Sequence, residues 1–351
     1  MSKTIESMLT CPVPIAHDDI IQLAHGGGGT KTAGLIERLF LPAFRNEHLE
    51  ALADGAILTV AGARLAFSTD TFVVKPIFFP GGDIGSLAVH GTANDLAMCG
   101  AAPLFLSAGL VLEEGFRLAD LGRIVASMAR ACAALGAPLV TGDTKVVDKG
   151  KGDGIFINTA GIGRVREGVA VGPGRARAGD AVLVSGPVGD HGIAVMAARE
   201  DLEFETALLS DSAPVASLVA SLLDVAPSTH VLRDPTRGGL ATALNEIAVA
   251  SQVGIHIEEA QVPVRPEVEG ACELLGFDPL YVACEGRFLA ILPEEDAKRA
   301  LAALHAHPDG GQARRVGRVV PEDPGRVVLC TRLGSHRFLT RLSGEQLPRI
   351  C

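Results

Sequence analysis

Apolar positions recur along this chain with two different periods, and the repeated switch between them predicts a mixed α/β fold. Short runs rich in β-branched and aliphatic residues at 56–60 and 64–69 flank an Ala-Gly turn and are typical of two paired strands. Apolar residues at helical spacing predict helices over 31–40, 86–99 and 119–135. Further strands of this half are expected at 104–112, 139–141 and 155–165.

A second alternation of strands and helices follows a segment rich in Gly and Pro at 172–179, which indicates a domain boundary. Strands are predicted at 181–185, 254–257, 280–284 and 288–292, with two more near the end. Helices are predicted at 213–225, 238–251, 266–275 and 294–306. We therefore divide the chain into a leader with its first helix (1–45), two domains (46–170 and 171–334) and a flexible tail (335–351).

Composition excludes several classes of protein. The 351 residues carry a net charge of −10, no Trp and one Tyr, which argues against a nucleic-acid partner because such proteins need basic faces and stacking aromatics. The longest uncharged run, 96–112, is interrupted by Gly100, Pro103 and Gly109 and does not suit a membrane span. Seven cysteines without a CxxC pair, and a start without an apolar signal segment, favour reduced thiols in the cytoplasm.

Four aspartates stand where a strand ends, a turn begins or a helix passes: Asp54, Asp70, Asp95 and Asp234. Carboxylates that converge from several elements are the ligands that Mg²⁺ prefers, and a nearby glycine run would let backbone N–H groups approach phosphate oxygens. Each aspartate alone is more often a helix cap or a turn former. As a set, they predict a site for Mg²⁺ and a polyphosphate.

Other candidate residues give weaker signals. The run Gly26, Gly27, Gly28 and Gly29 matches no phosphate-loop motif and is equally consistent with a linker. Thr141, Asp143 and Lys145 follow a predicted strand, where Lys145 would hold a phosphoryl group or remain a solvated loop lysine. Glu285 ends an apolar strand and is either a general base or the polar residue that terminates that strand. His90 and Asn94, four residues apart, would share one helix face.

The last residue, Cys351, places a thiol at the end of the chain, which is ordinarily its most mobile part. A prenylation signal would need the cysteine at position 348, which is Pro348. Chance remains an alternative for this cysteine alone, and Cys11 and Cys284 stay undecided. The remaining cysteines lie in apolar surroundings typical of core positions: Cys99, Cys132, Cys272 and Cys330.

Taken in order, several motifs resemble one family, the HypE carbamoyl dehydratases of [NiFe]-hydrogenase maturation. The matching segments are His25–Gly29, Ser68–Pro76, Phe79–Gly85, His90–Met98, Thr141–Lys145, Gly189–Gly192, Arg233–Leu240 and the terminal Pro-Arg-Ile-Cys. The resemblance runs along essentially the whole chain, and the terminal motif is its most diagnostic part. Residues 333–337 depart from the Gly-Gly-x-Arg turn usual in the family.

This resemblance implies the two-domain ATP-binding fold of aminoimidazole ribonucleotide synthetase, with N-terminal domains that pair into a barrel-like homodimer. It also implies that the transferase HypF loads a carbamoyl group onto Cys351. ATP then drives dehydration to a thiocyanate, and the cyanide passes to iron on a HypC–HypD complex. We expect Cys351, Glu285 and Lys145 to be catalytic, with Asp54, Asp70, Asp95 and Asp234 on Mg²⁺. The nucleotide-binding set is Gly26, Gly27, Gly28, Gly29, Asp70, Asn94, Asp95, Thr141 and Asp143.

Elementary chemistry agrees with this expectation. An amide oxygen leaves only after phosphorylation, and that step needs positioning and charge neutralisation, which Mg²⁺ and Lys145 would supply. Phosphorylation makes the amide N–H more acidic, so Glu285 could act as base without a greatly shifted pKa. Two alternatives remain: a selenophosphate synthetase with Cys11 as the reactive group, or a non-catalytic adaptor whose terminal thiol forms a mixed disulfide.

Overall fold

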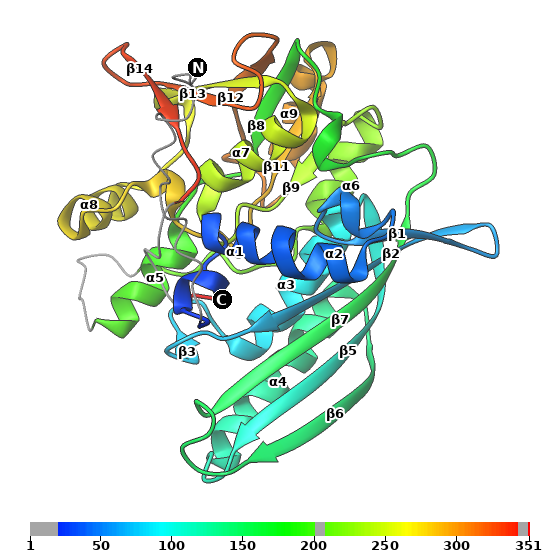
Figure 1. The fold of residues 1–351 in the computed structure, drawn as a ribbon, viewed down its shortest axis with the longest axis vertical. Helices are drawn as coiled ribbons and strands as arrows, with labels where there is room; N and C mark the ends of the chain where they lie inside the picture. The colour runs from blue at the N-terminus through cyan, green and yellow to red at the C-terminus, as the bar shows by residue number, and fades with distance from the viewer. Residues whose placement is uncertain (1–19, 201–207, 343–349) are drawn as a thin grey trace, which may run out of the picture.

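Two large β-sheets, each packed against helices, organise the chain, and a small third sheet pairs β3 (Phe78–Phe79) with β4 (Gly82–Asp83) (Figure 1). The structure is a computed structural model that describes residues 20–200, 208–342 and 350–351. Cys11 and Pro348 lie outside the described residues. Within the described ranges, no helix combines the length and the apolar character that crossing a membrane requires.

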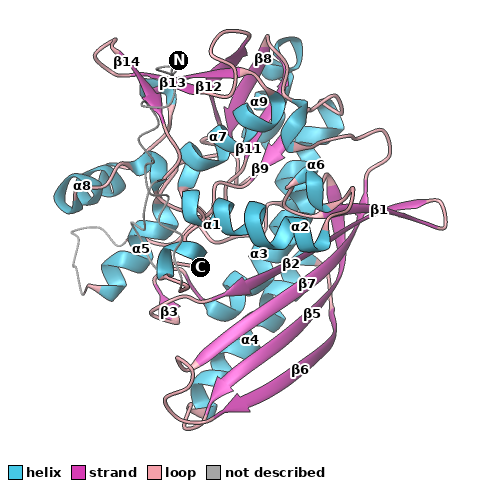
Figure 2. Cartoon of the chain, in the orientation of Figure 1, coloured by secondary structure: helices cyan, strands magenta, loops and turns pink. Residues whose placement is uncertain are grey.

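The first sheet has five strands in the order β1-β2-β7-β5-β6, with β1 and β6 at its edges. Neighbouring strands are antiparallel except β5 and β6, which are parallel. The bounds are β1 Ala56–Val60, β2 Ala63–Phe72, β5 Ala101–Glu113, β6 Leu139–Val147 and β7 Ile155–Val165. The helices α3 (Ile84–Met98) and α4 (Leu118–Leu135) lie along one face of this sheet, as Figure 2 shows.

Helix α3 carries residues of the site and is fixed at both its start and its flank. The Asp83 side chain caps it by accepting hydrogen bonds from the backbone N–H groups of Gly85 (2.8 Å) and Ser86 (3.0 Å). A Cβ on Gly85 would lie 2.6 Å from the backbone oxygen of Ile124 in α4. Small residues therefore let the two helices approach closely, and α3 is held in a single position.

The second sheet has seven strands in the order β14-β13-β10-β12-β8-β11-β9. The bounds are β8 Asp180–Val184, β9 Val231–Arg233, β10 Gly254–Glu258, β11 Leu289–Pro293, β12 Arg314–Val320, β13 Val327–Cys330 and β14 His336–Leu339. Its helices are α5 Asp190–Arg199, α6 Ala216–Val225, α7 Gly239–Ser251, α8 Pro266–Leu275 and α9 Glu294–Ala306. Strand β8 is buried on both faces, because one apolar cluster with α7 and another with α6 and α9 enclose it.

One predicted strand of this half was wrong, and one helix was not predicted. Residues 280–284 do not form a strand, because Asp278 caps the short 3₁₀ helix Pro279–Tyr281 by accepting from the N–H of Leu280 at 3.0 Å. Helix α5 was missed, and the residue before it, Gly189, has a positive φ of 89°, in the left-handed region that glycine favours. In the first sheet, strand β6 runs to Val147, so Lys145 lies within it rather than beyond it.

Both ends of the described chain meet the body of the protein. The N-terminal helical segment comprises a 3₁₀ helix Leu23–Gly26, α1 Thr30–Leu35, a π-helical stretch Ile36–Phe40 and α2 Leu41–Phe44. At the other end, β14 pairs with β13, so the segment that we placed in a flexible tail includes an ordered strand. Ile350 and Cys351 are buried among apolar side chains of the first domain and of α5.

Candidate active site

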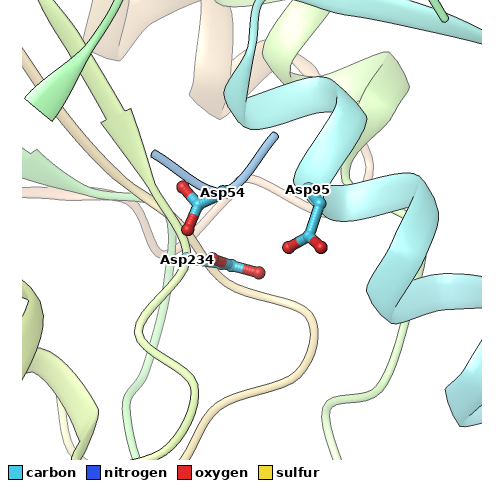
Figure 3. A group of neighbouring side chains, drawn as sticks. All are labelled: Asp54, Asp95 and Asp234. Carbon is cyan, nitrogen blue, oxygen red and sulfur yellow. The ribbon is translucent and has the colours of Figure 1, made fainter. Parts of the chain in front are cut away.

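Three aspartates from distant parts of the sequence meet where the two domains join (Figure 3). Asp54 precedes β1, Asp95 lies in α3 and Asp234 directly follows β9. Each contributes one carboxylate oxygen to a group in which these atoms all lie within 4.8 Å of one another. The predicted convergence of these three carboxylates is therefore observed.

This group holds more negative charge than its neighbours neutralise. Arg233 pairs with Asp54 at 2.8 Å but shares its guanidinium with Glu246 at 2.7 Å, and Asp95 accepts a hydrogen bond from the Ser68 hydroxyl at 2.7 Å. Burial, reinforced by Asp54, raises the pKa of Asp234 to about 8. Burial and Asp234 likewise raise the pKa of Asp95 well above its usual range. Such raised pKa values mark a place where a cation would be stabilised.

Asp70, the fourth predicted metal ligand, does not belong to this group of three. It lies near the end of β2 and accepts a hydrogen bond from the N–H of Thr71 at 2.7 Å. Burial raises the pKa of Asp70, and the guanidinium of Arg237 lowers it. Asp70 in turn raises the pKa of Asp95 and of Cys351, so it lies near both the aspartate group and the terminal thiol.

The terminal thiol lies inside the protein. Cys351 is 7% exposed, and its Sγ accepts a hydrogen bond from Nε of Arg237 at 3.1 Å. Burial raises the pKa of the Cys351 thiol, which the charge of Arg237 only partly offsets. In this position the sulfur is protonated at neutral pH and is a weak nucleophile.

Glu285 lies beside the thiol in the loop between the 3₁₀ helix Pro279–Tyr281 and β11. It is 3% exposed, and its Oε1 lacks a hydrogen-bond partner among the residues that the structure describes. Burial, followed by Asp234 and Asp70, raises the pKa of Glu285 well above its usual range, and the Cys351 thiol opposes this shift. The shift is larger than we expected from sequence, because a loop buried between two domains removes the carboxylate from water.

The glycine run reaches this site through Arg237. The Nη1 of Arg237 donates to the carbonyl of Gly26 at 2.6 Å. Gly28 has a φ of +74°, and a Cβ there would lie 2.9 Å from Cβ of Arg237. Glycine is therefore required at position 28 for the segment to lie against Arg237, while nucleotide binding by this run stays a prediction.

Asn94 has structural partners. Its side-chain amide donates to the carbonyls of Ala213 at 3.0 Å and Glu285 at 3.1 Å, and its oxygen accepts from the N–H of Val215 at 2.9 Å. His90, on the same helix face as predicted, contacts the Ser212 hydroxyl at 3.1 Å. These contacts join the two domains, and a role for Asn94 in nucleotide binding stays a prediction.

Thr141, Asp143 and Lys145 lie on β6, away from the aspartate group. Strand β6 is three strands from β2 in the sheet, a separation of about 14 Å. The Lys145 ammonium binds the Asp143 carboxylate at 2.7 Å, and both side chains are 70% exposed. Within the single chain, these residues are not brought to Cys351, and their assignments stay predictions.

Two residues of this site were not among the sequence candidates. Arg237 contacts the thiol, and His191 of α5 contacts the carbonyl of Ile350 through Nε2 at 2.8 Å. Both lie in motifs that the resemblance had singled out, 233–240 and 189–192. Those motifs were the only available signal, because the contacts span 114 and 159 residues of sequence.

Comparison with known proteins decides the family. Models of the AIR synthase related proteins match residues 52–165 with their N-terminal domain and 177–330 with their C-terminal domain. The chain is 55% identical to the carbamoyl dehydratase HypE of Cupriavidus necator over the full length of both proteins. The chain belongs to the HypE family.

Solved structures of HypE share the fold. A HypE crystallised in complex with ATP is 50% identical, covers 95% of this chain and all of its own, and superposes with a TM-score of 0.80. A HypE–HypF complex gives a TM-score of 0.84 at 47% identity, covering 88% of this chain and 99% of that chain. The expected two-domain architecture of AIR synthase related proteins is thus confirmed.

Proposed function

We propose that this protein is an ATP-dependent carbamoyl dehydratase that converts a carbamoyl group on its own Cys351 to a thiocyanate. The observation that carries the proposal is the buried Cys351 thiol beside Glu285 and Arg237, next to the aspartate group of an ATP-binding family. A terminal thiol held beside a carboxylate base is what dehydration on that thiol requires. A non-catalytic adaptor would have no use for that arrangement.

The aspartate group fits a Mg²⁺ ion. Its three carboxylates offer hard oxygen donors, their oxygens lie within 4.8 Å of one another, and their raised pKa values reflect uncompensated charge. Asp54, Asp95 and Asp234 would hold the ion, with Asp70 nearby. The bound ion would neutralise charge on the triphosphate of ATP during phosphoryl transfer.

Dehydration removes one oxygen and two N–H protons from the carbamoyl group. The carbamoyl oxygen first bonds to the γ-phosphorus of ATP, and the bond between that phosphorus and ADP breaks. The nitrogen then loses one proton. The carbon–oxygen bond then breaks, phosphate leaves with the oxygen, and loss of the second proton forms the nitrile. Glu285 is placed to accept a proton in this sequence, and its raised pKa makes its carboxylate a stronger base once ionised.

Loading of the carbamoyl group requires a different position of the thiol. Because burial raises the pKa of Cys351, the thiol reacts poorly where it lies. Outside the body its pKa would return to the ordinary range. We infer that HypF loads Cys351 when the thiol lies outside the body of the protein, that dehydration occurs in the buried position, and that the cyanide is delivered to a HypC–HypD complex in the cytoplasm.

A homodimer would complete the site. Thr141, Asp143 and Lys145 pair with Ser107, Gly109 and Val111 and so share the outer face of the sheet. The same face carries Phe67, Phe105 and Ile162, which are 40–48% exposed. An apolar face of this kind suits the sheet of a second copy, with which it would form the barrel expected for the family. In that arrangement Lys145 would serve the partner subunit's site.

Intact-mass measurement tests the function. The protein is incubated with HypF, carbamoyl phosphate and ATP, with Cys351→Ala as the matched control. The parent should first gain one carbamoyl group and then lose one water, whereas Cys351→Ala should gain nothing. A carbamoyl group on any other cysteine, or a stable carbamoyl adduct that ATP does not change, would contradict the proposal.

A further inference from the structure

We propose that His191 and Arg237 form a dock that holds the terminal residue in its reactive position, and that Arg237 also binds the carbamoyl oxygen. This inference rests on the dehydratase function proposed above. It assigns the docking of the tail to two side chains of the second domain. Neither is an aspartate of the metal group nor the predicted base.

His191 holds the main chain of the tail. A carbonyl oxygen only accepts hydrogen bonds, so the contact of Nε2 with the carbonyl of Ile350 requires the proton on Nε2. Nδ1 then accepts from the Ser210 hydroxyl at 2.8 Å, and Ser210 accepts from the N–H of Ser212 at 3.0 Å. Burial lowers the pKa of His191, which favours this neutral form. Phe79 packs edge-on against the ring at 5.4 Å.

Arg237 holds the sulfur. Its Nε donates to Sγ of Cys351, while Nη1 donates to the carbonyl of Gly26. These two contacts use two of the five N–H groups of the guanidinium, which are fixed in one plane. The side chain therefore has a set orientation and retains further donors for a group attached to the thiol.

A carbamoyl group attached to Sγ places its oxygen two bonds from the atom that Arg237 already binds. A guanidinium in a buried site can hold that oxygen in line with phosphorus and neutralise negative charge on the phosphoryl group that the oxygen accepts. Arg237 is thus a catalytic residue, since it touches the group that reacts. His191 is a positioning residue, because it acts through the main chain of Ile350.

Alkylation of the free protein tests the dock without any substrate. Iodoacetamide is added in the absence of nucleotide and HypF, and the rate at Cys351 is measured by peptide mass mapping, with Cys330 in the same digest as reference. His191→Ala and Arg237→Gln should each raise the alkylation rate at Cys351 at least about tenfold. Each variant loses one buried hydrogen bond, and that loss weakens the docking of the terminal residue by about this factor. His191→Gln keeps an amide donor and should stay nearer the parent. Arg315→Gln, at the exposed pair with Glu294, is the matched control and should change nothing.

Conversion of pre-loaded protein tests the catalytic part. Arg237→Gln should accept the carbamoyl group at least as fast as the parent but form the thiocyanate about a hundredfold more slowly, with Arg237→Lys intermediate. Unchanged alkylation in both His191→Ala and Arg237→Gln overturns the dock. Unchanged conversion in Arg237→Gln overturns its catalytic role. Failure of the parent to convert at all would refute the proposed function, while the alkylation result would still stand on its own.

Discussion

The side chain of Asn94, in the first domain, donates a hydrogen bond to the main-chain carbonyl of Glu285, in the second, at 3.1 Å. This contact fixes the loop that carries the proposed base relative to the helix that carries Asp95. The distance between base and metal group is therefore constrained by an amide that binds the main chain of Glu285 rather than its carboxylate. A hydrogen bond between the two domains thus contributes to the geometry of the site.

Replacing Asn94 should loosen this joint. Asn94→Ala removes three hydrogen bonds from buried groups and should lower the free energy of unfolding by about 3 kcal/mol. Asn94→Asp keeps the shape but loses both donors and adds a charge, so it should cost more. Urea unfolding measures both, with the exposed Asn46→Ala as control. Equal stability of Asn94→Ala and the parent would show that Asn94 does not stabilise the contact between the two domains.

The aspartate group should be needed for dehydration but not for loading. Asp95→Asn and Asp234→Asn remove metal-binding charge, so each should cripple use of Mg²⁺ and ATP. Transfer of the carbamoyl group onto Cys351 needs only a reachable thiol and should continue in both variants. Mass spectrometry with and without ATP separates the two steps. Thiocyanate formation at the parental rate in either variant would show that the ligand assignment is wrong.

Asp190 should make the protein less stable as pH rises. Burial, with the nearby charge of Asp211, raises its pKa to about 6, although Arg265 opposes this at 2.8 Å. A carboxyl group whose pKa is higher in the folded state stabilises the fold below its unfolded pKa, near 4. That contribution is lost as pH rises through about 6 and amounts to at most about 3 kcal/mol.

Thermal unfolding from pH 4 to 7 measures this effect. Asp190→Asn cannot ionise and should show a smaller loss of stability over that range than the parent, and Arg265 is exposed enough to find water instead. Asp143→Asn is the matched control, because Asp143 is exposed and its pKa is lowered by Lys145. Identical pH profiles for Asp190→Asn and the parent would refute the assignment.

Elements with strong local patterns could be predicted from the sequence. Helix α9 begins with three acidic residues and carries a clear apolar face, and its predicted bounds, 294–306, match the structure. The 279–285 segment could not be predicted in this way. Its apolar residues resemble a strand, yet Leu280 and Cys284 are buried in the apolar core of the second domain, beside α7, and not by pairing in a sheet.

Some residues of the site could likewise be predicted from the sequence, and others could not. Asp54, Asp95 and Asp234 were found because carboxylates at the ends of elements carry a chemical signal in the sequence itself. His191 and Arg237 gain their roles only when the end of the chain returns to them. The contacts of Ile350 and Cys351 with these two side chains depend on the complete fold, and local spacing in the sequence does not predict them. The role proposed for Lys145 likewise requires a second copy of the chain, which the sequence of one chain does not reveal.

The last prediction separates Glu285 from Lys145 by the step at which each variant stops. Glu285→Gln keeps the size and hydrogen bonding of the side chain but cannot take up a proton. It should bind ATP, accept the carbamoyl group and transfer phosphate, then stall before the nitrile. Lys145→Ala should load normally but fail earlier, at phosphoryl transfer, for lack of a compensating charge.

Quenched-flow analysis with ATP labelled in its γ-phosphate distinguishes the two variants. Glu285→Gln should accumulate a labile phosphorylated species, and Lys145→Ala should accumulate none. Because Lys145 would act across the dimer, mixing Lys145→Ala with Glu285→Gln should restore some activity through heterodimers in which one site holds both residues. Dehydration by Glu285→Gln at the parental rate would assign the proton to another base, since Glu285 would then serve only as a buried carboxyl in the loop before β11. Absence of rescue on mixing would instead place Lys145 in its own subunit's site or outside the reaction.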